Sequence, residues 1–315
     1  MSPSFDAGGL ACLVALADTA SFAGAADRLA LTPSAVSQRV RALEAQWGQP
    51  LVIRTRPLQF TAAGGVLLRL ARQWQSLGAQ AARELGAGAA SGERVPIGVN
   101  ADSLATWVLP ALDGLMRAGL REGHGIDLVV DDQDFTLEAL REGAVLGCVS
   151  SVGEPLRGCR VQRLGVMRYV AVASPAFVAE MLPEGLRAAD LGRAPFLVFN
   201  RKDGMARAWA KDAFGLRNVR LRERHVPSSE AYVAAAERGW GIGIAPLLQV
   251  EAALAAGRLQ RVRPEASVPV TLHWHHWQLG SEPEADTRSA TTPDTTLLHR
   301  IGDALAQQAA QALEP

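Results

Sequence analysis

The stretch Leu31–Arg56, LTPSAVSQRVRALEAQWGQPLVIRTR, decides the fold of the N-terminal part of the chain. Thr32 can cap a helix with its hydroxyl, and Pro33 suits the first helical position, where a missing N–H costs nothing. Four apolar residues then recur at helical spacing: Val36, Val40, Leu43 and Trp47. Gly48 ends the pattern. The sequence therefore predicts an amphipathic helix that begins after Thr32, faces the core with these four residues and stops at Gly48.

The opposite face of this predicted helix is polar, and its side chains can form hydrogen bonds to DNA. Its members are Ser34, Ser37, Gln38 and Arg41, with Arg39 at the flank. Gln38 can pair with the edge of an adenine, and Arg39 or Arg41 with guanine or phosphate. Each good bidentate base contact contributes about 1–3 kcal/mol of discrimination. The serine hydroxyls and the helix N-terminus, at Thr32 and Pro33, can fix the register on phosphates.

Two shorter helices are predicted before this one. The apolar residues of the first are Leu10, Leu13, Val14 and Leu16, and those of the second are Phe22, Ala25, Ala26 and Leu29. Ser21 is placed to cap the second helix. Helix, short helix, turn and capped helix in this order describe a helix-turn-helix, whose last helix lies in the major groove. The alternative is a surface helix with ordinary polar residues.

The segment that follows, PLVIRTRPLQFT, predicts two short strands around Arg56 and Pro57. Such a pair of strands forms a wing beside the helix-turn-helix. We expect this wing to bring Arg54 and Arg56 to the phosphate backbone of DNA.

Charge is distributed unevenly along a chain that is neutral overall, with 32 basic and 32 acidic side chains. The segment from Ser21 to Arg72 holds seven arginines and only two acids, Asp27 and Glu44. A basic segment beside an acidic remainder favours an anionic partner for that segment alone. The alternative is a solvated basic face.

Length and composition define the class of protein. At 315 residues and 48% hydrophobic residues, the chain can bury the cores of two or three domains. It has no apolar run long enough to span a membrane and no basic start before its first apolar stretch, so we expect neither a membrane span nor an export signal. The three cysteines, Cys12, Cys148 and Cys159, are widely spaced, which suits reduced thiols in the cytoplasm and offers no metal spacing.

Beyond the wing, Thr61 is placed to cap a long helix with a heptad-like apolar seam. The seam consists of Ala63, Leu67, Leu70, Trp74, Leu77 and Ala81. Pairing with a second copy of the chain would bury the seam and set two recognition helices apart for a two-fold symmetric DNA site. The alternative is packing against the C-terminal domain of the same chain. The stretch GAGAASGERVP then predicts a flexible hinge.

From Val95 onward the pattern alternates between strand and helix. VPIGVN, IDLVVDD and VLGCVSS are predicted strands, and DSLATWVLPALDGLMRAG and FTLEALREG are the helices between them. This βαβαβ run predicts a mostly parallel sheet flanked by helices. APFLVFN, VRLRERHV and GIGIAP indicate a second such half, so we expect two α/β halves with a cleft between them.

Ligands in open α/β sheets bind at the carboxyl ends of strands, which directs attention to four loops. The candidate ligand-binding residues there are Asn100, Asp102 and Ser103; Asp131 and Asp132; Ser150 and Ser151; and Ser228, Ser229 and Glu230. Adjacent carboxylates at Asp131 and Asp132 repel unless a cation is near, which favours a lysine ammonium or an arginine guanidinium as guest. Alternation along the strand sends these two side chains to opposite faces, so we expect only one to reach the cleft.

The hydroxyls and Glu230 could then hold the carboxylate and amine of an amino acid. Plain helix capping by Asp102, Ser228 or Ser229, with Glu230 favouring the helix dipole, is the alternative reading of these residues.

Other signals point away from catalysis. The glycines of GWGIGIAP are followed at once by Pro246, which argues against dinucleotide binding. Strand alternation puts His273 and His275 on one face and His276 on the other, which favours a core or interface strand over a metal site. We expect no enzyme, no metal and no cofactor. The polar tract from residue 280 to 296 predicts a mobile surface loop.

The stretch SFAGAADRLALTPSAVSQRVRALEAQWGQPLVIRTRPLQFTAAG resembles the winged helix-turn-helix of LysR-type transcriptional regulators. Further along, VNADSLATWVLPAL, EALREGAVLGCVSS, SSEAYVAAAERGWGIGIAP and HWHHW are similar to the subgroup of that family that contains ArgP and LysG. The resemblance implies a DNA-binding regulator that senses a basic amino acid, L-lysine or L-arginine. It also implies control of an amino-acid exporter gene, activation through RNA polymerase, and a homodimer or homotetramer.

The expected fold is α/β with an all-α N-terminus. A winged helix-turn-helix domain occupies residues 1–61, a linker helix and hinge residues 62–92, and a bilobal α/β effector domain like periplasmic binding proteins residues 93–315. The alternatives from other classes are a sequence-tolerant architectural DNA-binding protein without ligand response, and a solute-binding protein or enzyme that uses the cleft alone.

Overall fold

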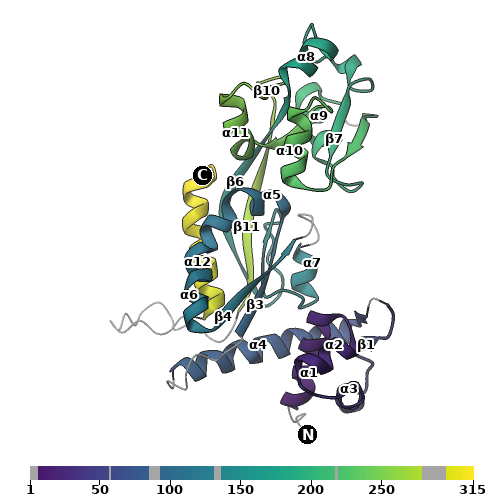
Figure 1. Cartoon of the computed structure of the whole chain (residues 1–315), viewed down its shortest axis with the longest axis vertical. Helices are drawn as coiled ribbons and strands as arrows, with labels where there is room; N and C mark the ends of the chain where they lie inside the picture. Colours follow the sequence, from purple (N-terminus) through teal and green to yellow (C-terminus); the bar gives the residue numbers. More distant parts are fainter. Residues whose placement is uncertain (1–5, 57, 85–92, 131–135, 217–218, 279–295) are drawn as a thin grey trace.

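The computed structural model describes residues 6–56, 58–84, 93–130, 136–216, 219–278 and 296–315. Figure 1 shows a helical N-terminal domain, a long helix that runs beneath the rest of the chain, and an elongated α/β region with two lobes. Residues 86–92 of the predicted hinge, Asp131 and Asp132, and almost all of the predicted loop 280–296 lie outside the described residues. The last four residues of the predicted hinge, 93–96, belong to a strand, so the prediction is wrong there.

The N-terminal domain has the predicted helix-turn-helix and wing. Its elements are α1 (Ala7–Thr19), α2 (Phe22–Arg28), α3 (Pro33–Trp47), β1 (Val52–Ile53) and β2 (Gln59–Phe60). The hydroxyls of Ser21 and Thr32 cap α2 and α3, and Gly48 ends α3 in the left-handed conformation at φ +67°, as predicted. Trp47, in the last turn of α3, is 37% exposed, so the prediction that it faces the core is wrong.

The wing is anchored to the recognition helix by the one acidic residue of the opening stretch. The Glu44 carboxylate accepts hydrogen bonds from the backbone N–H groups of Leu51 (2.9 Å) and Val52 (3.4 Å). Thr61 caps the next helix through the N–H of Gly64 and donates to the Pro50 carbonyl oxygen at 2.7 Å. A Cβ at Gly64 would lie 1.9 Å from the Leu51 carbonyl oxygen, so this position requires glycine despite its weak helix propensity.

The long helix α4 (Ala62–Glu84) carries the predicted seam. Its first part packs into the core of the N-terminal domain, where Leu67, Leu68 and Ala71 are buried beside α1. Further along, Trp74 and Leu77 are 54% and 41% exposed. The seam is therefore covered at one end and open at the other within a single chain.

The lobe nearer to α4, which we call lobe I, contains the predicted βαβαβ unit. Its elements are β3 (Glu93–Val99), α5 (Ala101–Ser103), a π-helical turn (Leu104–Val108), α6 (Leu109–Glu122), β4 (His124–Val130), α7 (Thr136–Arg141) and β5 (Gly147–Ser150). Strand β3 pairs in parallel with both β4 and β5. Helix α6 and the C-terminal helix α12 (Leu297–Ala312) pack together on one face of the sheet, and α7 lies on the other (Figure 1).

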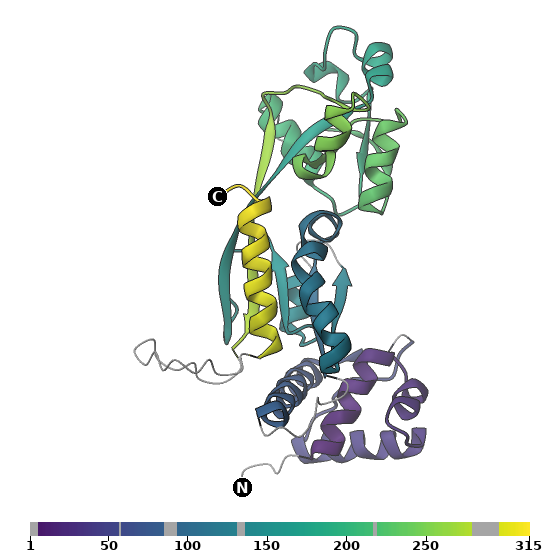
Figure 2. The same cartoon turned by 60° about the vertical axis from the view of Figure 1, so that its left-hand side comes forward.

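Two long strands connect the lobes. They are β6 (Cys159–Ala173) and β11 (Ser267–Trp277), which pair antiparallel along their length. β11 also pairs antiparallel with β5 through His273–His276, so the sheet of lobe I is parallel in its core and antiparallel where the chain crosses over. Figure 2 shows β6 and β11 rising together from lobe I into the second lobe.

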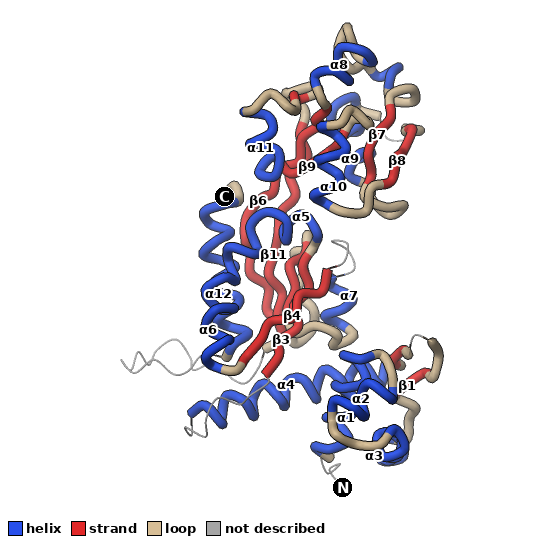
Figure 3. The backbone as a smooth tube through the Cα atoms, viewed as in Figure 1, coloured by secondary structure: helices blue, strands red, loops and turns tan. Residues whose placement is uncertain are grey.

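The second lobe, lobe II, is built around the far ends of β6 and β11. It holds α8 (Pro175–Met181), a 3₁₀ turn (Ala188–Asp190), β7 (Pro195–Val198), α9 (Met205–Phe214), β8 (Arg222–His225), α10 (Ser229–Glu237), β9 (Gly243–Pro246), α11 (Leu247–Ala255) and β10 (Gln260–Arg261). β7 pairs in parallel with β8, and β9 pairs with β6. Figure 3 shows strands and helices in both lobes, as the sequence predicted, with β6 and β11 running from one lobe into the other.

Among the residues that the structure describes, no single helix is long and apolar enough to cross a membrane. Helices α1 and α2 reach that length only together, and they meet at a bend of 118°.

Candidate functional site

The polar face of α3 is open to solvent. Ser34, Gln38 and Arg41 are exposed on it, and Ser37 is half-buried. At the N-terminus of the helix, the Thr32 hydroxyl accepts from the N–H of Ala35 at 3.2 Å and lies 2.9 Å from the Ser34 hydroxyl. The first turn of α3 therefore presents two hydroxyl groups at a helix N-terminus, an arrangement that suits a phosphate.

The wing adds two arginines next to this face. The Arg54 guanidinium donates to the Ser37 hydroxyl at 3.2 Å and lies 5.0 Å from the centroid of the Phe22 ring. Arg56 is exposed. The hydrogen bond to Ser37 of α3 and the stack on Phe22 of α2 hold Arg54 against the helix-turn-helix, so that the wing adds positive charge beside the polar face of α3.

The other arginines of the basic segment are engaged in contacts within the chain. The Arg39 guanidinium lies against α1: a Cβ at Gly8 would be 2.9 Å from its Nη1, and it hydrogen-bonds the Cys12 thiol. Burial raises the pKa of that thiol, and Arg39 opposes the rise. Arg28 and Arg72 both pair with Asp18, each at 2.8 Å. Arg41, Arg54 and Arg56 are exposed beside the α3 face, and Arg39 is also exposed despite its contact with α1.

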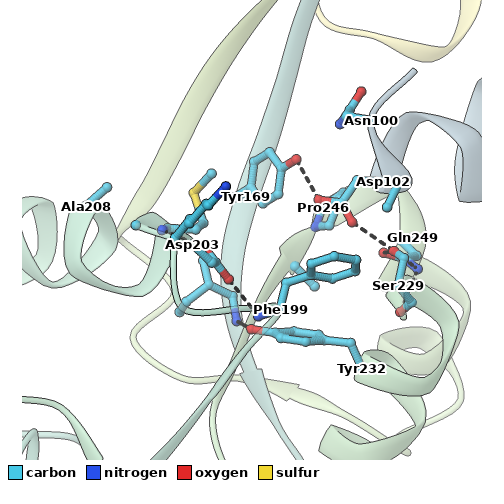
Figure 4. A pocket seen from close by; sticks show the side chains of 16 residues that line it. Asn100, Asp102, Tyr169, Phe199, Asp203, Ala208, Ser229, Tyr232, Pro246 and Gln249 are labelled. Atoms are coloured by element: carbon cyan, nitrogen blue, oxygen red, sulfur yellow. Dashed lines mark hydrogen bonds between the residues drawn. The ribbon is translucent and has the colours of Figure 1, made fainter. Parts of the chain in front are cut away.

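The cleft between the lobes contains a pocket of about 350 Å³, toward the small end of the range for small-molecule sites (Figure 4). Its lining includes Asn100, Ala101 and Asp102 from lobe I, and Tyr169 from the connecting strand β6. Lobe II supplies the rest: Phe199, Lys202, Asp203, Gly204, Met205, Ala208, Ser229, Tyr232, Ile244, Ala245, Pro246 and Gln249. The pocket therefore lies between the lobes, as the sequence predicted for the ligand.

Asp102 is the centre of a hydrogen-bond network across this cleft. Its carboxylate accepts from the Tyr169 hydroxyl and from the Ser229 hydroxyl, each at 2.8 Å (Figure 4). The Gln249 amide in turn donates to the Ser229 hydroxyl at 2.9 Å. Because Asp102 belongs to lobe I and Ser229 to lobe II, one carboxylate ties the two lobes together.

Asn100 has unused hydrogen-bonding capacity. Its side chain is 3% exposed and lines the pocket, yet neither its amide nitrogen nor its oxygen has a hydrogen-bond partner. A buried polar group without a partner costs free energy, so its amide is available to a polar ligand.

A second carboxylate and one ammonium complete the charged lining. Asp203 accepts from the N–H groups of Phe199 and Met205, both at 2.8 Å, which fixes the loop before α9. Lys202 is the neighbouring residue on that loop and is exposed. With Asp102, these side chains give the lining a formal charge of −1.

The structure brings three of the predicted ligand-binding residues together, namely Asn100, Asp102 and Ser229. Five other described candidates lie outside the lining. Ser228 caps α10 and donates to the exposed Glu230, Ser150 accepts from the N–H of Val152, and Ser103 is fully buried. Ser151 is also outside the lining.

Sequence reasoning did not identify Tyr169, Asp203 and Gln249. Tyr169 lies within a long strand, where it reads as a core residue. Asp203 lies in the loop after β7, and Gln249 lies in the first turn of α11, directly after β9. The loop after β7, which carries Asp203, follows the same rule as the predicted loops and would have been found by applying it to lobe II.

The histidines of β11 lie as alternation predicted. His273 and His275 face the same side, with ring centroids 6.3 Å apart, whereas His276 stacks on Trp274 on the opposite side. His275 is fully buried, and its Nε2 lies 2.7 Å from the Val152 carbonyl oxygen. Burial lowers the pKa of both His273 and His275, so the folded protein favours neutral rings.

Comparison with known proteins assigns both regions. Residues 8–65 match the family described as bacterial regulatory helix-turn-helix protein, lysR family, and residues 88–286 match the LysR substrate binding domain. The transcriptional regulator LysG of Mycobacterium tuberculosis is 42% identical over 283 residues, which are 89% of this chain and 90% of that protein. The transcriptional regulator ArgP of Aeromonas salmonicida is 44% identical over 86% of this chain and 90% of its own length.

Solved structures agree with this assignment. The crystal structure of ArgP from Mycobacterium tuberculosis superimposes with a TM-score of 0.81 at 38% identity and covers 99% of both chains. Full-length LysG from Corynebacterium glutamicum with bound effector Arg gives a TM-score of 0.71 at 33% identity, over 99% of this chain and 100% of that one. The chain belongs to the LysR family of bacterial transcriptional regulators, within the group that contains LysG and ArgP.

Proposed function

We propose that this regulator binds L-arginine or L-lysine in the cleft and that the bound amino acid changes its affinity for an operator. The observation that carries the proposal is the Asp102 carboxylate, which joins both lobes at the pocket. The similar LysG structure is described with arginine as its effector, which supports a basic amino acid here.

Charge complementarity supports the choice of a basic amino acid. The lining has a formal charge of −1, and lysine or arginine carries +1 at neutral pH. A carboxylate attracts an ammonium or a guanidinium, so Asp102 and Asp203 are the groups we assign to the two cationic ends of the ligand. We assign the ligand carboxylate to the Asn100 amide and the Lys202 ammonium.

For DNA, we propose that α3 enters the major groove with Ser34, Ser37, Gln38 and Arg41 toward the bases and phosphates. Arg54 and Arg56 of the wing then contact the backbone of the same duplex. The exposure of Ser34, Gln38, Arg41, Arg54 and Arg56 supports the assignment.

We also propose a two-fold symmetric dimer that uses the open end of the α4 seam. Trp74 and Leu77 expose large apolar side chains there, and a second copy of α4 would cover them. Pairs of such dimers form a tetramer in this proposal. The target is the gene of an amino-acid exporter or a related metabolic gene, and activation proceeds through RNA polymerase.

Calorimetric titration of the full-length protein tests the ligand. We expect saturable binding of L-arginine or L-lysine and none of L-glutamate, because the lining repels a second carboxylate. Equal affinity for glutamate and arginine, or no binding of either basic amino acid, would overturn the ligand assignment. Specific DNA binding is tested by gel shift with the intergenic DNA beside the gene that encodes this regulator. Shuffled DNA of the same length is the comparison.

A further inference from the structure

Helix α4 carries two arginines one turn apart that engage different parts of the chain. Arg72 pairs with Asp18 of α1 at 2.8 Å and is only 8% exposed. Arg69 instead donates to the carbonyl oxygen of Arg141, at the end of α7, at 2.6 Å. The Arg69 guanidinium also lies 4.4 Å from the centroid of the Trp277 ring. One arginine holds α4 to the DNA-binding domain and the other holds it to lobe I.

The Arg72 side makes α4 part of the DNA-binding domain. A buried guanidinium separated from its carboxylate would leave an uncompensated charge in the core, which is strongly unfavourable. Asp18 also pairs with Arg28 of α2, so three elements of the domain meet at one carboxylate. Helix α4 is therefore anchored to the helix-turn-helix through this ion pair.

The Arg69 side closes the end of α7. The last carbonyl groups of a helix have no partner within it and need donors from elsewhere. Here the Trp277 indole N–H donates to the Leu140 carbonyl oxygen at 3.2 Å, and Arg69 supplies the donor for Arg141. Arg69 and Trp277 thus both donate hydrogen bonds to carbonyl groups at the end of α7, and the Arg69 guanidinium stacks on the Trp277 indole.

The backbones at this contact approach closely, and a glycine lies on each side. A Cβ at Gly65 of α4 would lie 3.1 Å from the Glu142 carbonyl oxygen. Gly143, at φ +75°, has the left-handed conformation, and a Cβ there would meet Arg69 Cβ at 2.8 Å. The contact is a fitted interface between α4 and the segment after α7.

Trp277 connects this interface to the cleft. It is the last residue of β11, whose first residues pair with β6 in lobe II, as Ser267 does with Val170. At the other end, Trp277 pairs with Cys159 in lobe I. A change in the angle between the lobes would bend β6 and β11, which run from lobe I into lobe II (Figure 1). The last residue of β11, Trp277, carries the ring that Arg69 contacts.

We propose that Arg69 is the positioning residue through which the state of the cleft reaches the DNA-binding domain. The inference rests on the proposed function, because it assumes that the cleft binds a basic amino acid that alters DNA affinity. Trp277 and the end of α7 form the lobe I side of the junction, and Arg72 fixes the other side to the helix-turn-helix.

The variant Arg69→Met replaces the aliphatic stem of arginine with a side chain of similar shape and removes the guanidinium. Arg117→Met is the matched control, since Arg117 is an exposed arginine of lobe I that pairs with Asp113 on its own helix. Two quantities are measured for each protein: the ratio of operator affinities with and without L-arginine, and the Kd of L-arginine by calorimetry. We expect a ratio of about 5- to 150-fold in the wild type and in Arg117→Met. In Arg69→Met we expect a ratio within about twofold of one, with an arginine Kd within about threefold of wild type.

A wild-type ratio in Arg69→Met would overturn the proposal. If that variant does not fold, Arg69→Lys retains the charge without the planar guanidinium and is expected to give an intermediate ratio, and a full ratio there would contradict the role of stacking. A wild-type protein whose operator affinity ignores arginine would instead overturn the proposed function, and the coupling role with it.

Hydrogen exchange of the ligand-free proteins separates these two failures. Loss of the Arg69 contact should speed exchange of the amides of Glu142 and Gly143, which donate to Glu138 and Leu140 at the end of α7. Unchanged exchange there in Arg69→Met would show that the contact does not hold the helix end, and that result overturns the inference whether or not arginine is the ligand.

Discussion

The two candidate sites are built in opposite ways. The α3 face and wing are formed by side chains within one stretch of the sequence that are mostly open to solvent and joined only by isolated contacts, such as the hydrogen bond from Arg54 to Ser37. The pocket draws residues from position 100 to position 249, and its central carboxylate already has two hydroxyl partners. Changes in the first site should therefore act one contact at a time. Changes in the second should disturb several groups together, because networked polar groups depend on one another.

The largest effect is expected for Asp102→Asn. The amide that replaces the carboxylate carries no charge for the ligand, and it cannot accept both the Tyr169 and Ser229 hydroxyl hydrogens without rearrangement. Truncating one partner of a buried, hydrogen-bonded charge pair costs about 2–5 kcal/mol, so calorimetry should show arginine binding weakened by at least about 30-fold. DNA binding in the absence of arginine should change little.

The matched control for this change is Glu251→Gln, which removes an exposed carboxylate on α11. It should leave the arginine Kd unaltered. Retention of wild-type arginine affinity in Asp102→Asn would remove Asp102 from the ligand site.

A smaller and more local effect is expected for Gln38→Ala on the recognition helix. Loss of one bidentate base contact should cost about 1–3 kcal/mol on the operator and relax the preference at one base pair. Fluorescence anisotropy with operator and shuffled duplexes measures the difference, and Gln49→Ala, exposed just beyond α3, is the control. Equal losses on both duplexes would count against base recognition by Gln38.

Replacing an arginine of the wing tests the proposed phosphate contacts. Arg54→Ala should weaken binding to all duplexes and reduce the slope of log affinity against log salt by about 0.9, the value for one phosphate contact. Arg193→Ala, an exposed arginine of lobe II, should leave the slope unchanged. An unaltered salt dependence in Arg54→Ala would place that side chain away from the backbone.

The smallest effect is expected for the pH dependence of folding stability, through the buried His275 of lobe I. Burial is the main cause that holds the pKa of His275 below 6.5 in the folded protein, with His273 adding to it, while the Val152 carbonyl and Glu154 oppose the shift. The unfolded chain therefore binds more protons below pH 6.5, and the folded state should lose stability as the pH falls, by at most about 1.4 kcal/mol per pH unit for one histidine. Above pH 6.5 this contribution is fully present.

Urea unfolding at several pH values between 5 and 7.5 measures this dependence. The variant His275→Gln should show a shallower loss of stability on acidification than the wild type. A steeper or equal loss would assign the pH dependence to other groups.

The contrast between the sites also explains what the sequence could predict. The caps at Ser21 and Thr32, the spacing of Val36, Val40 and Leu43, and the stop at Gly48 act within one or two helical turns, so local rules suffice. The rule that ligands bind at the carboxyl ends of strands is also local, and it selected Asn100, Asp102 and Ser229, which line the pocket.

Residues that depend on tertiary contacts escaped these rules. Arg39 and Arg69 look alike in the sequence, but the first lies against α1 and the second against Trp277, more than 200 residues away. The exposure of Trp47 and the approach of Tyr169 to Asp102 likewise depend on how helices and lobes pack. Periodicity predicts on which face of a helix or strand a residue lies, whereas the tertiary fold determines which other residues pack against that face.

The most direct test of the central claim, that an α3 face reads DNA under control of the cleft, is an anisotropy titration of the intergenic duplex and of a shuffled duplex, each with and without L-arginine. The account predicts binding to the intergenic duplex at least about 10³-fold tighter than to the shuffled one. It also predicts a change of about 5- to 150-fold on adding arginine, for the intergenic duplex only. Equal affinity for the two duplexes, unaffected by arginine, would contradict it.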